Sequence, residues 1–232
     1  MKLRRLASVV KNTLFRKSKP SLNGLDDKLQ KYLSFDGGFF IEAGANDGYS
    51  QSNTYFLEKR RGWKGLLVEG IPELAHKCIR TRKLSRIVNC ALVANAHDGQ
   101  TVTMHYAHLM SLVDGAMKNE TEENEYIALG IKVQHLDASY EVEVPARTLE
   151  SVLEEDPPER IDFFSLDVEG FELEVLKGIN LDRFRPNHIL VEILEETGLF
   201  DQVDSFLRSN RYLMVERMSD NDYFYRDSNC DV

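Results

Sequence analysis

A turn of small residues bordered by acids lies in the first quarter of the chain, and its composition could bind a cationic ligand. The segment Glu42-Ala43-Gly44-Ala45-Asn46-Asp47-Gly48 follows an apolar run and precedes a helical pattern. Glycine lets the backbone turn sharply near a ligand, and the next helix offers free amides at its start. A dinucleotide-binding loop would have a small residue at Asn46, and the carboxylate of Glu42 suits an amino group better than a pyrophosphate. The turn therefore favours the methionine end of S-adenosylmethionine, with a tight turn that binds no ligand as the alternative.

A second carboxylate could bind a ribose. Glu69 ends the predicted strand that follows the turn. An acid at this place can accept two hydrogen bonds from ribose hydroxyls. Both S-adenosylmethionine and NAD are bound in this way, so Glu69 alone does not distinguish them, and a surface carboxylate is the alternative. The glycine turn at the right distance from Glu69 favours the ribose role.

Three further carboxylates stand where later strands end. Asp167 and Glu169 follow the apolar run from Ile161, and Glu192 ends the run after it. Closely spaced carboxylates raise the pKa of one another, which suits a general base near neutral pH. We therefore expect a base or an acceptor-orienting group among Asp167, Glu169 and Glu192. A contact of Asp167 with the cofactor's amino group, a helix N-cap and a divalent-metal site are the alternatives.

Two histidines and an arginine are weaker candidates. His108 and His135 lie in the segment expected to cover the site, and either could be a base. A loop histidine is more often structural. Arg147 could reach an anionic acceptor, although a solvated or paired surface arginine is the more common case.

The elements that position these residues alternate between strand and helix patterns. Strands are predicted over 39–41, 65–69, 85–93, 161–167 and 188–193, with helices over 52–60, 72–83, 148–155, 171–177 and 201–209. Further strand character occurs at 101–106 and 141–144, an exposed loop or helix at 119–125, and a closing hairpin at 212–225. Alternation of this kind predicts a doubly wound α/β sheet with right-handed crossovers. Its ligands bind beyond the carboxyl ends of the strands.

Composition and charge limit the partners and the location. The chain has 232 residues, 42% of them hydrophobic and 29% charged, which is typical of one globular domain. The segment 1–20 holds seven of the 29 Lys and Arg side chains and no acid, so the remainder has 22 basic against 38 acidic side chains, a net charge of −16. A body this acidic disfavours a nucleic-acid partner. We expect a basic leader over 1–23 and one catalytic domain over 24–232.

The basic leader and the cysteines indicate in which compartment the protein acts. Residues 1–19 combine cations with apolar residues at near-helical spacing, so peripheral contact with an anionic membrane is one expectation and a solvated leader is the other. The three scattered cysteines predict thiols in a reducing compartment. No apolar run has the length of a membrane span. These features favour a cytoplasmic protein, with the inner face of the membrane as the alternative location.

The blocks described above resemble the FkbM-type methyltransferases. The first comprises the turn at 42–48, Gln51-Ser52-Asn53-Thr54 and Gly62-Trp63-Lys64-Gly65-Leu66-Leu67-Val68-Glu69. The second, Asp167-Val168-Glu169-Gly170-Phe171-Glu172 with Leu176 and Gly178, is similar to the family's D-x-E-G-x-E-x-x-x-L-x-G signature. The third is His188-Ile189-Leu190-Val191-Glu192. Together they cover roughly residues 38–194.

The resemblance implies a class I methyltransferase fold, with a mostly parallel seven-stranded sheet whose last strand is antiparallel. It implies S-adenosylmethionine as donor and usually an oxygen acceptor, such as a polyketide or sugar hydroxyl, and from it we expect O-methylation of a sugar, glycan or related small molecule. It places Glu42, Gly44 and Gly48 at the methionine end, Asn46 and Asn53 beside the cofactor, Glu69 at ribose and Ala91 near adenine. Gly70-Ile71-Pro72 departs from the family's usual Glu-Pro or Glu-Ala. A nucleotide-dependent oxidoreductase and a noncatalytic interaction module with the same fold are the alternatives.

Overall fold

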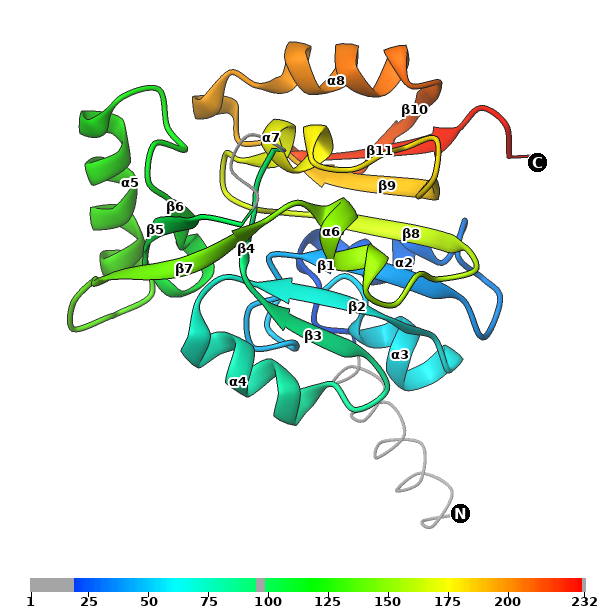
Figure 1. Cartoon of the computed structure of the whole chain (residues 1–232), viewed down its shortest axis with the longest axis horizontal. Coiled ribbons are helices and arrows are strands. Elements are labelled where there is room, and N and C mark those ends of the chain that lie inside the picture. Colours follow the sequence, from blue (N-terminus) through cyan, green and yellow to red (C-terminus); the bar gives the residue numbers. More distant parts are fainter. Residues whose placement is uncertain (1–18, 95–98, 231–232) are drawn as a thin grey trace, which may run out of the picture.

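A seven-stranded sheet runs through the centre of the protein, as a computed structural model shows for residues 19–94 and 99–230 (Figure 1). The order across the sheet is β10-β11-β9-β8-β1-β2-β3. The strands are β1 (Phe39–Ala43), β2 (Lys64–Glu69), β3 (Arg86–Asn89), β8 (Ile161–Leu166), β9 (Pro186–Glu192), β10 (Tyr212–Arg217) and β11 (Asp222–Asp227).

The directions of these strands confirm the predicted fold class. Strands β3, β2, β1, β8 and β9 pair in parallel. The last strand, β11, lies between β9 and β10 and is antiparallel to both. The carboxyl ends of the five parallel strands therefore lie along one edge of the sheet, where ligands of such sheets bind.

Consecutive large residues on the central strands face opposite sides of the sheet, and this is why both sides carry helices. Phe40, Phe163 and Leu190 pack with α2 (Leu25–Leu29) and α3 (Tyr55–Arg61). Their chain neighbours Ile41, Phe164 and Val191 belong to the other core. That core also takes in α6 (Leu149–Glu154), α7 (Glu172–Lys177) and α8 (Phe200–Ser209). Strands with side chains buried on both faces are typical of a doubly wound sheet.

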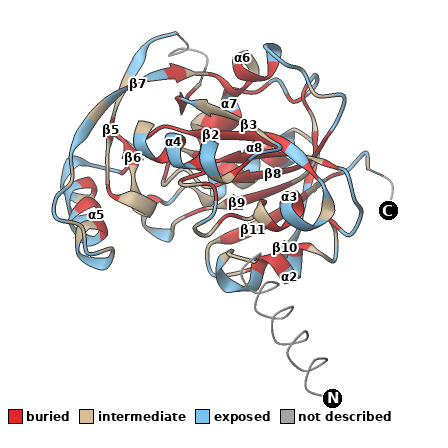
Figure 2. Cartoon of the chain, turned by 90° about the horizontal axis from the view of Figure 1, so that it is seen from below, coloured by how far each residue is buried: buried red, intermediate tan, exposed pale blue. Residues whose placement is uncertain are grey.

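A smaller, four-stranded sheet extends from the carboxyl edge in the order β4-β7-β5-β6. Its strands are β4 (Ala91–Leu92), β5 (Thr101–His105), β6 (Leu112–Val113) and β7 (Glu141–Arg147), and α5 (Glu120–Val133) packs beside it. Figure 2 shows buried residues along the central strands and exposed ones on the outer surfaces of α5 and β7. The segment from β5 to α5 thus forms a separate layer beside the main sheet (Figure 1).

Two predicted elements needed correction, and at 119–125 the helix is the alternative that the structure confirms. The single strand expected at 85–93 is two, because the chain leaves the main sheet after Asn89, whose side-chain amide donates to the carbonyls of Glu69 and Gly70. The helix expected from Ser52 begins at Tyr55. The segment 119–125 is the start of α5, whose N-cap Asn119 accepts a hydrogen bond from the Glu122 amide.

The remaining elements follow the sequence more closely. Helix α4 (Pro72–Thr81) begins at its proline, and the strands β10 and β11 form the expected closing hairpin. Short 3-10 helices occupy Leu22–Gly24, His108–Met110 and Glu195–Thr197. None of the described helices is both long and apolar enough to cross a membrane. The membrane contact expected of residues 1–19 falls almost wholly outside the described residues, and the boundary between residues 23 and 24 stays a prediction.

Candidate active site

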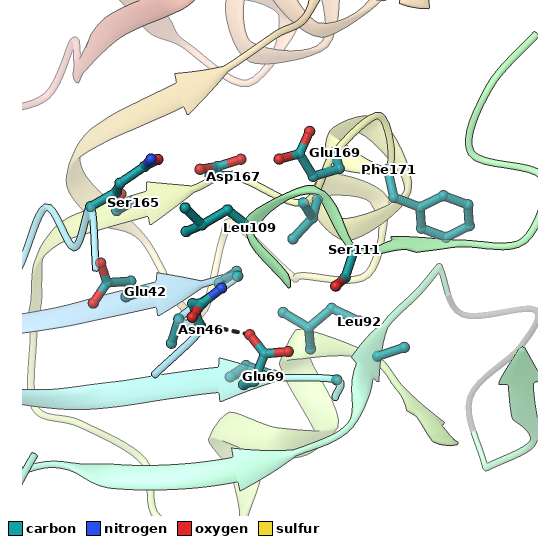
Figure 3. Close-up of a pocket in the computed structure, with 18 of the residues that line it drawn as sticks. Glu42, Asn46, Glu69, Leu92, Leu109, Ser111, Ser165, Asp167, Glu169 and Phe171 are labelled. Atoms are coloured by element: carbon teal, nitrogen blue, oxygen red, sulfur yellow. Dashed lines mark hydrogen bonds between the residues drawn. The ribbon is translucent and has the colours of Figure 1, made fainter. Parts of the chain in front are cut away.

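A cavity of about 870 Å³, counted with its open mouth, lies at the carboxyl ends of β1, β2 and β8 (Figure 3). Its size is that of a small-molecule or cofactor site. Glu42 and Gly44 line it from β1 and the turn after it, Glu69 from β2 and Asp167 from the end of β8. The opposite wall comes from the small-sheet layer, which contributes Leu92, His108, Leu109 and Ser111.

The turn after β1 fits between its two neighbouring strands because it contains Gly44. The amides of Gly44 and Ala45 both donate to the carbonyl oxygen of Val68, at 3.0 and 3.1 Å. Gly44 has φ +79°, and a Cβ there would lie 1.7 Å from the carbonyl oxygen of Asp167. Only glycine permits this approach, so Gly44 sets the distance between the turn and the Asp167 strand end.

Glu69 lies where a ribose-binding acid is expected. Its carboxylate is buried, and it accepts hydrogen bonds from the amides of Asn46 at 2.7 Å and Ile71 at 2.8 Å. Burial raises the pKa of Glu69 to about 7, against the lowering effect of these amides. Each oxygen keeps acceptor capacity for a hydroxyl. The Asn46 side-chain amide also donates to the His108 carbonyl at 3.3 Å, which joins the turn to the opposite wall.

Glu42 lines the cavity, but four protein donors surround its carboxylate. These are the hydroxyls of Ser52 and Thr54, the amide of Asn53, and a guanidinium nitrogen of Arg82 at 3.2 Å. Direct contact of Glu42 with a cofactor amino group stays a prediction. Its evident role in the structure is to hold the start of α3 against the turn.

Arg82 is the functional residue that sequence reasoning missed. It is 1% exposed, pairs with both Glu42 and Glu58, and donates to the Gly48 carbonyl at 3.3 Å. Gly48 is outside the cavity lining, because it packs on Arg82: a Cβ at Gly48 would lie 2.8 Å from Arg82 Cγ. A basic residue at the end of a helical pattern ordinarily indicates a solvated side chain, so no sequence signal marked Arg82.

Two polar atoms at the cavity lack a partner among the described residues, and they fit a bound cofactor. Asn53 Oδ1 and His108 Nδ1 are buried without a hydrogen-bond partner, while Asn53 Nδ2 donates to Ser165 Oγ at 3.1 Å. Buried polar atoms are rarely left in this state. Asn53 Oδ1 is an acceptor suited to an ammonium group. With Glu69 available for ribose hydroxyls, the residues present match the donors of S-adenosylmethionine.

The structure brings together the three carboxylates predicted to do chemistry. Asp167 and Glu169 line the cavity, whereas Glu192 lies behind Asp167 and shares a hydrogen bond with it. Burial, followed by the charges of Glu192 and Glu169, raises the pKa of Asp167 well above its usual value. Burial raises the pKa of Glu169 to about 8, and Tyr126 of α5 donates a hydrogen bond to Glu169. The carboxylates of Asp167, Glu169 and Glu192 do not form a metal-ligand set within the described residues.

Another carboxylate, the buried Glu172, supports the loop that carries Glu169. One oxygen accepts from the amides of Val168 at 3.2 Å and Gly170 at 3.0 Å, and burial raises the pKa of Glu172 to about 7. In the sequence, Glu172 is marked only as the last acid of the D-x-E-G-x-E block. Glu172 shapes the backbone at Glu169, which adopts φ +54°.

The weaker candidates lie in different places. Ala91 lines the cavity between Cys90 and Leu92, consistent with the predicted adenine side. His108 reaches the cavity, whereas His135 is exposed and is not among the residues that line it. Arg147 pairs with Glu155 at 2.5 Å and is likewise outside the cavity lining.

Comparisons with known proteins agree with this geometry. The sequence profile of the methyltransferase FkbM domain matches residues 42–214. The methyltransferase sdnD of Sordaria araneosa is 27% identical over 193 residues, covering 75% of this chain and 73% of the relative.

Two solved structures have a similar fold at low sequence identity. The methyltransferase domain of METTL16 superposes with a TM-score of 0.50 at 11% identity, over 90% of this chain and 67% of that one. A TehB-like SAM-dependent methyltransferase from Corynebacterium glutamicum covers 97% of both chains with a TM-score of 0.45 at 9% identity. At such identities the likeness concerns the fold alone.

Proposed function

We propose the reaction of this protein from one premise: the chain belongs to the FkbM methyltransferase family and uses S-adenosylmethionine as its methyl donor. The reaction we infer is O-methylation of a hydroxyl group on a sugar, a glycan or a related small molecule. The observation that carries this proposal is the half-buried carboxylate of Asp167, which lines the cofactor cavity beside Glu169 and has a raised pKa.

A hydroxyl acceptor needs a group that removes its proton as the new bond forms. A carboxylate with a raised pKa is a stronger base than an ordinary one, and its proton affinity lies closer to neutral pH. Asp167 meets this requirement because burial and two neighbouring carboxylates oppose its ionisation. Glu192 holds the Asp167 carboxyl by a hydrogen bond, so we assign Glu192 a positioning role.

The other residues of the cavity bind and orient. When bound, S-adenosylmethionine supplies a methyl group that its sulfonium already activates, so the protein mainly has to align the acceptor. Glu69 would hold the ribose hydroxyls, and Asn53 Oδ1 would accept from the ammonium group. Glu169, fixed by Tyr126, would accept a hydrogen bond from a second hydroxyl of the acceptor. Acceptors with several hydroxyls fit such a pair of carboxylates.

The charge of the molecule favours a small acceptor over a nucleic acid. The chain beyond Pro20 carries a net charge of −16. A phosphate backbone would meet repulsion from a surface of this charge. We therefore propose a small-molecule or glycan acceptor. The scattered cysteines favour a reducing compartment, so we also propose a cytoplasmic site of action.

A methyl-transfer assay tests the proposal. The full chain is incubated with S-adenosylmethionine labelled in its methyl group and with sugars, nucleotide sugars, glycolipid intermediates, amines and RNA. We expect label in a hydroxyl-bearing acceptor, with NMR placing the methyl carbon on oxygen. Transfer only to nitrogen, or only to RNA, would overturn the proposed acceptor class.

A further inference from the structure

A second cluster of ligand-forming side chains lies in the small-sheet layer, apart from the cofactor cavity. His105 is on β5, Asp114 follows β6, and Glu123 is on α5. None of the three lines the cavity. His105 Nε2 faces both carboxylates, at 3.4 Å from Asp114 Oδ1 and 3.6 Å from Glu123 Oε1. The sequence separation of these residues gave no indication that they meet.

The separations match those between ligands that share one small cation. Zinc binds histidine nitrogen and carboxylate oxygen at about 2.0–2.2 Å, so tetrahedral ligand atoms lie roughly 3.3–3.6 Å apart. Both distances from His105 Nε2 fall in this range. All three ligand atoms lie within 4.8 Å of one another. Nitrogen together with carboxylate oxygen is a donor set that divalent transition metals accept.

The carboxylates around the histidine differ in how firmly they are held. Glu141 Oε1 lies 3.8 Å from the other ring nitrogen, Nδ1, which is beyond hydrogen-bond distance, and the Glu141 side chain is 70% exposed. Glu123 is fixed, because its second oxygen accepts from the Gly115 amide at 2.9 Å. Within the cluster, only Asp114, 67% exposed in its side chain, has freedom to close on an ion.

The carboxylates of the cluster also favour a bound cation. The carboxylates of Asp114, Glu123 and Glu141 lie 3.4, 3.6 and 3.8 Å from the ring nitrogens of His105, and they form ion pairs with the ring only when it is protonated. A divalent ion would balance two of these negative charges at the point where the ligand atoms converge. We propose that His105, Asp114 and Glu123 bind one divalent transition-metal ion, of the zinc class, that ties α5 to the β5–β6 hairpin.

Such an ion would act on the site through α5. Glu123 precedes Tyr126 by about one turn of α5. The Tyr126 hydroxyl donates a hydrogen bond to the Glu169 carboxylate at the cavity. An ion that fixes Glu123 therefore also fixes the helix that carries Tyr126. The ion is assigned a structural role, and its binding requires neither the methyl donor nor an acceptor.

Calorimetric titration of the chelator-treated full chain with ZnCl₂ tests this inference. All variants carry Cys230→Ser, so that the partly exposed thiol does not compete. We expect one ion per chain, with the Kd at least about ten-fold weaker in Asp114→Asn and in His105→Gln. His76→Gln, an exposed histidine of α4, should leave the Kd unchanged.

Hydrogen exchange supplies a second readout that does not depend on activity. Zn²⁺ should slow amide exchange across residues 112–126 in the parent chain and leave it unchanged in Asp114→Asn. Because the Asp114 side chain is exposed, this variant should fold. Failure of the parent chain to bind Zn²⁺, or equal Kd values in all variants, would overturn the inference and leave the proposed methyl transfer unaffected.

Discussion

At the scale of single residues, a substitution of Asp167 should separate cofactor binding from methyl transfer. Asp167→Asn keeps the size of the side chain but removes its ability to accept a proton. We expect kcat to fall by about 10²–10⁴-fold, the usual contribution of a general base, with the affinity for S-adenosylmethionine little changed. Steady-state kinetics and calorimetry measure the two effects. Asp182→Asn, an exposed aspartate far from the cavity, is the control. Undiminished turnover in Asp167→Asn would refute the assignment of the base.

Arg82, at the end of α4, should contribute strongly to stability because it pairs with two buried carboxylates. Arg82→Met leaves Glu42 buried without a cation and Glu58 with Lys59 alone, and breaking a buried ion pair in this way costs about 3–5 kcal/mol. Urea unfolding measures the loss. Arg80→Met, on the exposed side of the same helix, should change stability by less than about 0.5 kcal/mol. Equal unfolding midpoints for the two variants would show that Arg82 is not needed.

The sequence predicted which residues line the site better than it predicted the contacts that these residues make. Glu69, Asn53 and Asp167 line the cavity, because their places at strand ends and before α3 follow from the strand pattern, while their roles toward a cofactor stay predictions. Gly48 and Glu192 lie behind it. Arg82 could not have been predicted, since its partner Glu42 is distant in the sequence and the contact exists only once α4 packs on the sheet.

At the scale of elements, the turn after β1 depends on the absence of a side chain at Gly44. Gly44→Ala would place a methyl group 1.7 Å from the Asp167 carbonyl oxygen and would force the β1 turn and the β8 end apart. We expect loss of measurable S-adenosylmethionine binding and a lower thermal midpoint.

Gly37→Ala is a matched control for that variant. Gly37 has a similar φ of +72°, but nothing lies within 4 Å of its missing Cβ. The substitution should cost only the backbone strain of about 1–2 kcal/mol, with binding retained. If both variants bind the cofactor equally, the close approach at Gly44 is not what shapes the site.

Elements with strong local patterns were predictable, and those defined by tertiary pairing were not. The buried runs of β1, β2, β8 and β9 are apolar on both faces, and this pattern reads directly from the sequence. The break between β3 and β4 gave no such signal, because residues 85–93 are continuously strand-like. The pairing of β4 with β7, a strand much later in the chain, decides where the break falls.

At the scale of the whole molecule, the buried acids should make stability depend on pH. Burial raises the pKa values of Glu69, Glu169 and Glu172 from 4.5 to about 7, 8 and 7. The folded chain therefore holds protons that the unfolded chain releases above about pH 4.5. The stability that these groups contribute is full below pH 4.5 and is lost as the pH rises to about 8.

Urea midpoints of the ligand-free chain at pH 5, 6.5 and 8 measure this dependence. Between pH 5 and 8, the free energy of unfolding should fall by about 1–3 kcal/mol less in Glu172→Gln than in the parent chain, because the variant lacks one buried ionisable group. Glu125→Gln, at an exposed glutamate of α5, should show the same fall as the parent chain. If the parent chain instead became more stable toward pH 8, the conclusion that Glu69, Glu169 and Glu172 hold their protons in the folded chain would be wrong.

The fold class and the cofactor followed from residues 38–194, whereas the small-sheet layer did not. Strands β4 and β6 have only two residues each, β5 and β7 are partly exposed, and β7 pairs with β4 and β5 across long sequence distances, so the local patterns are weak. The same layer supplies one wall of the cavity through His108, Leu109 and Ser111. The wall of the cavity formed by this layer is therefore the part of the site that the sequence predicted least well.

A crystal structure of the full chain grown with S-adenosylmethionine tests the central claim most directly. We expect density for the cofactor in the cavity at the ends of β1 and β2, with the ribose hydroxyls within about 3.2 Å of the Glu69 carboxylate and the ammonium group near Asn53 Oδ1. Cofactor density at another place, or a ribose directed away from Glu69, would contradict it.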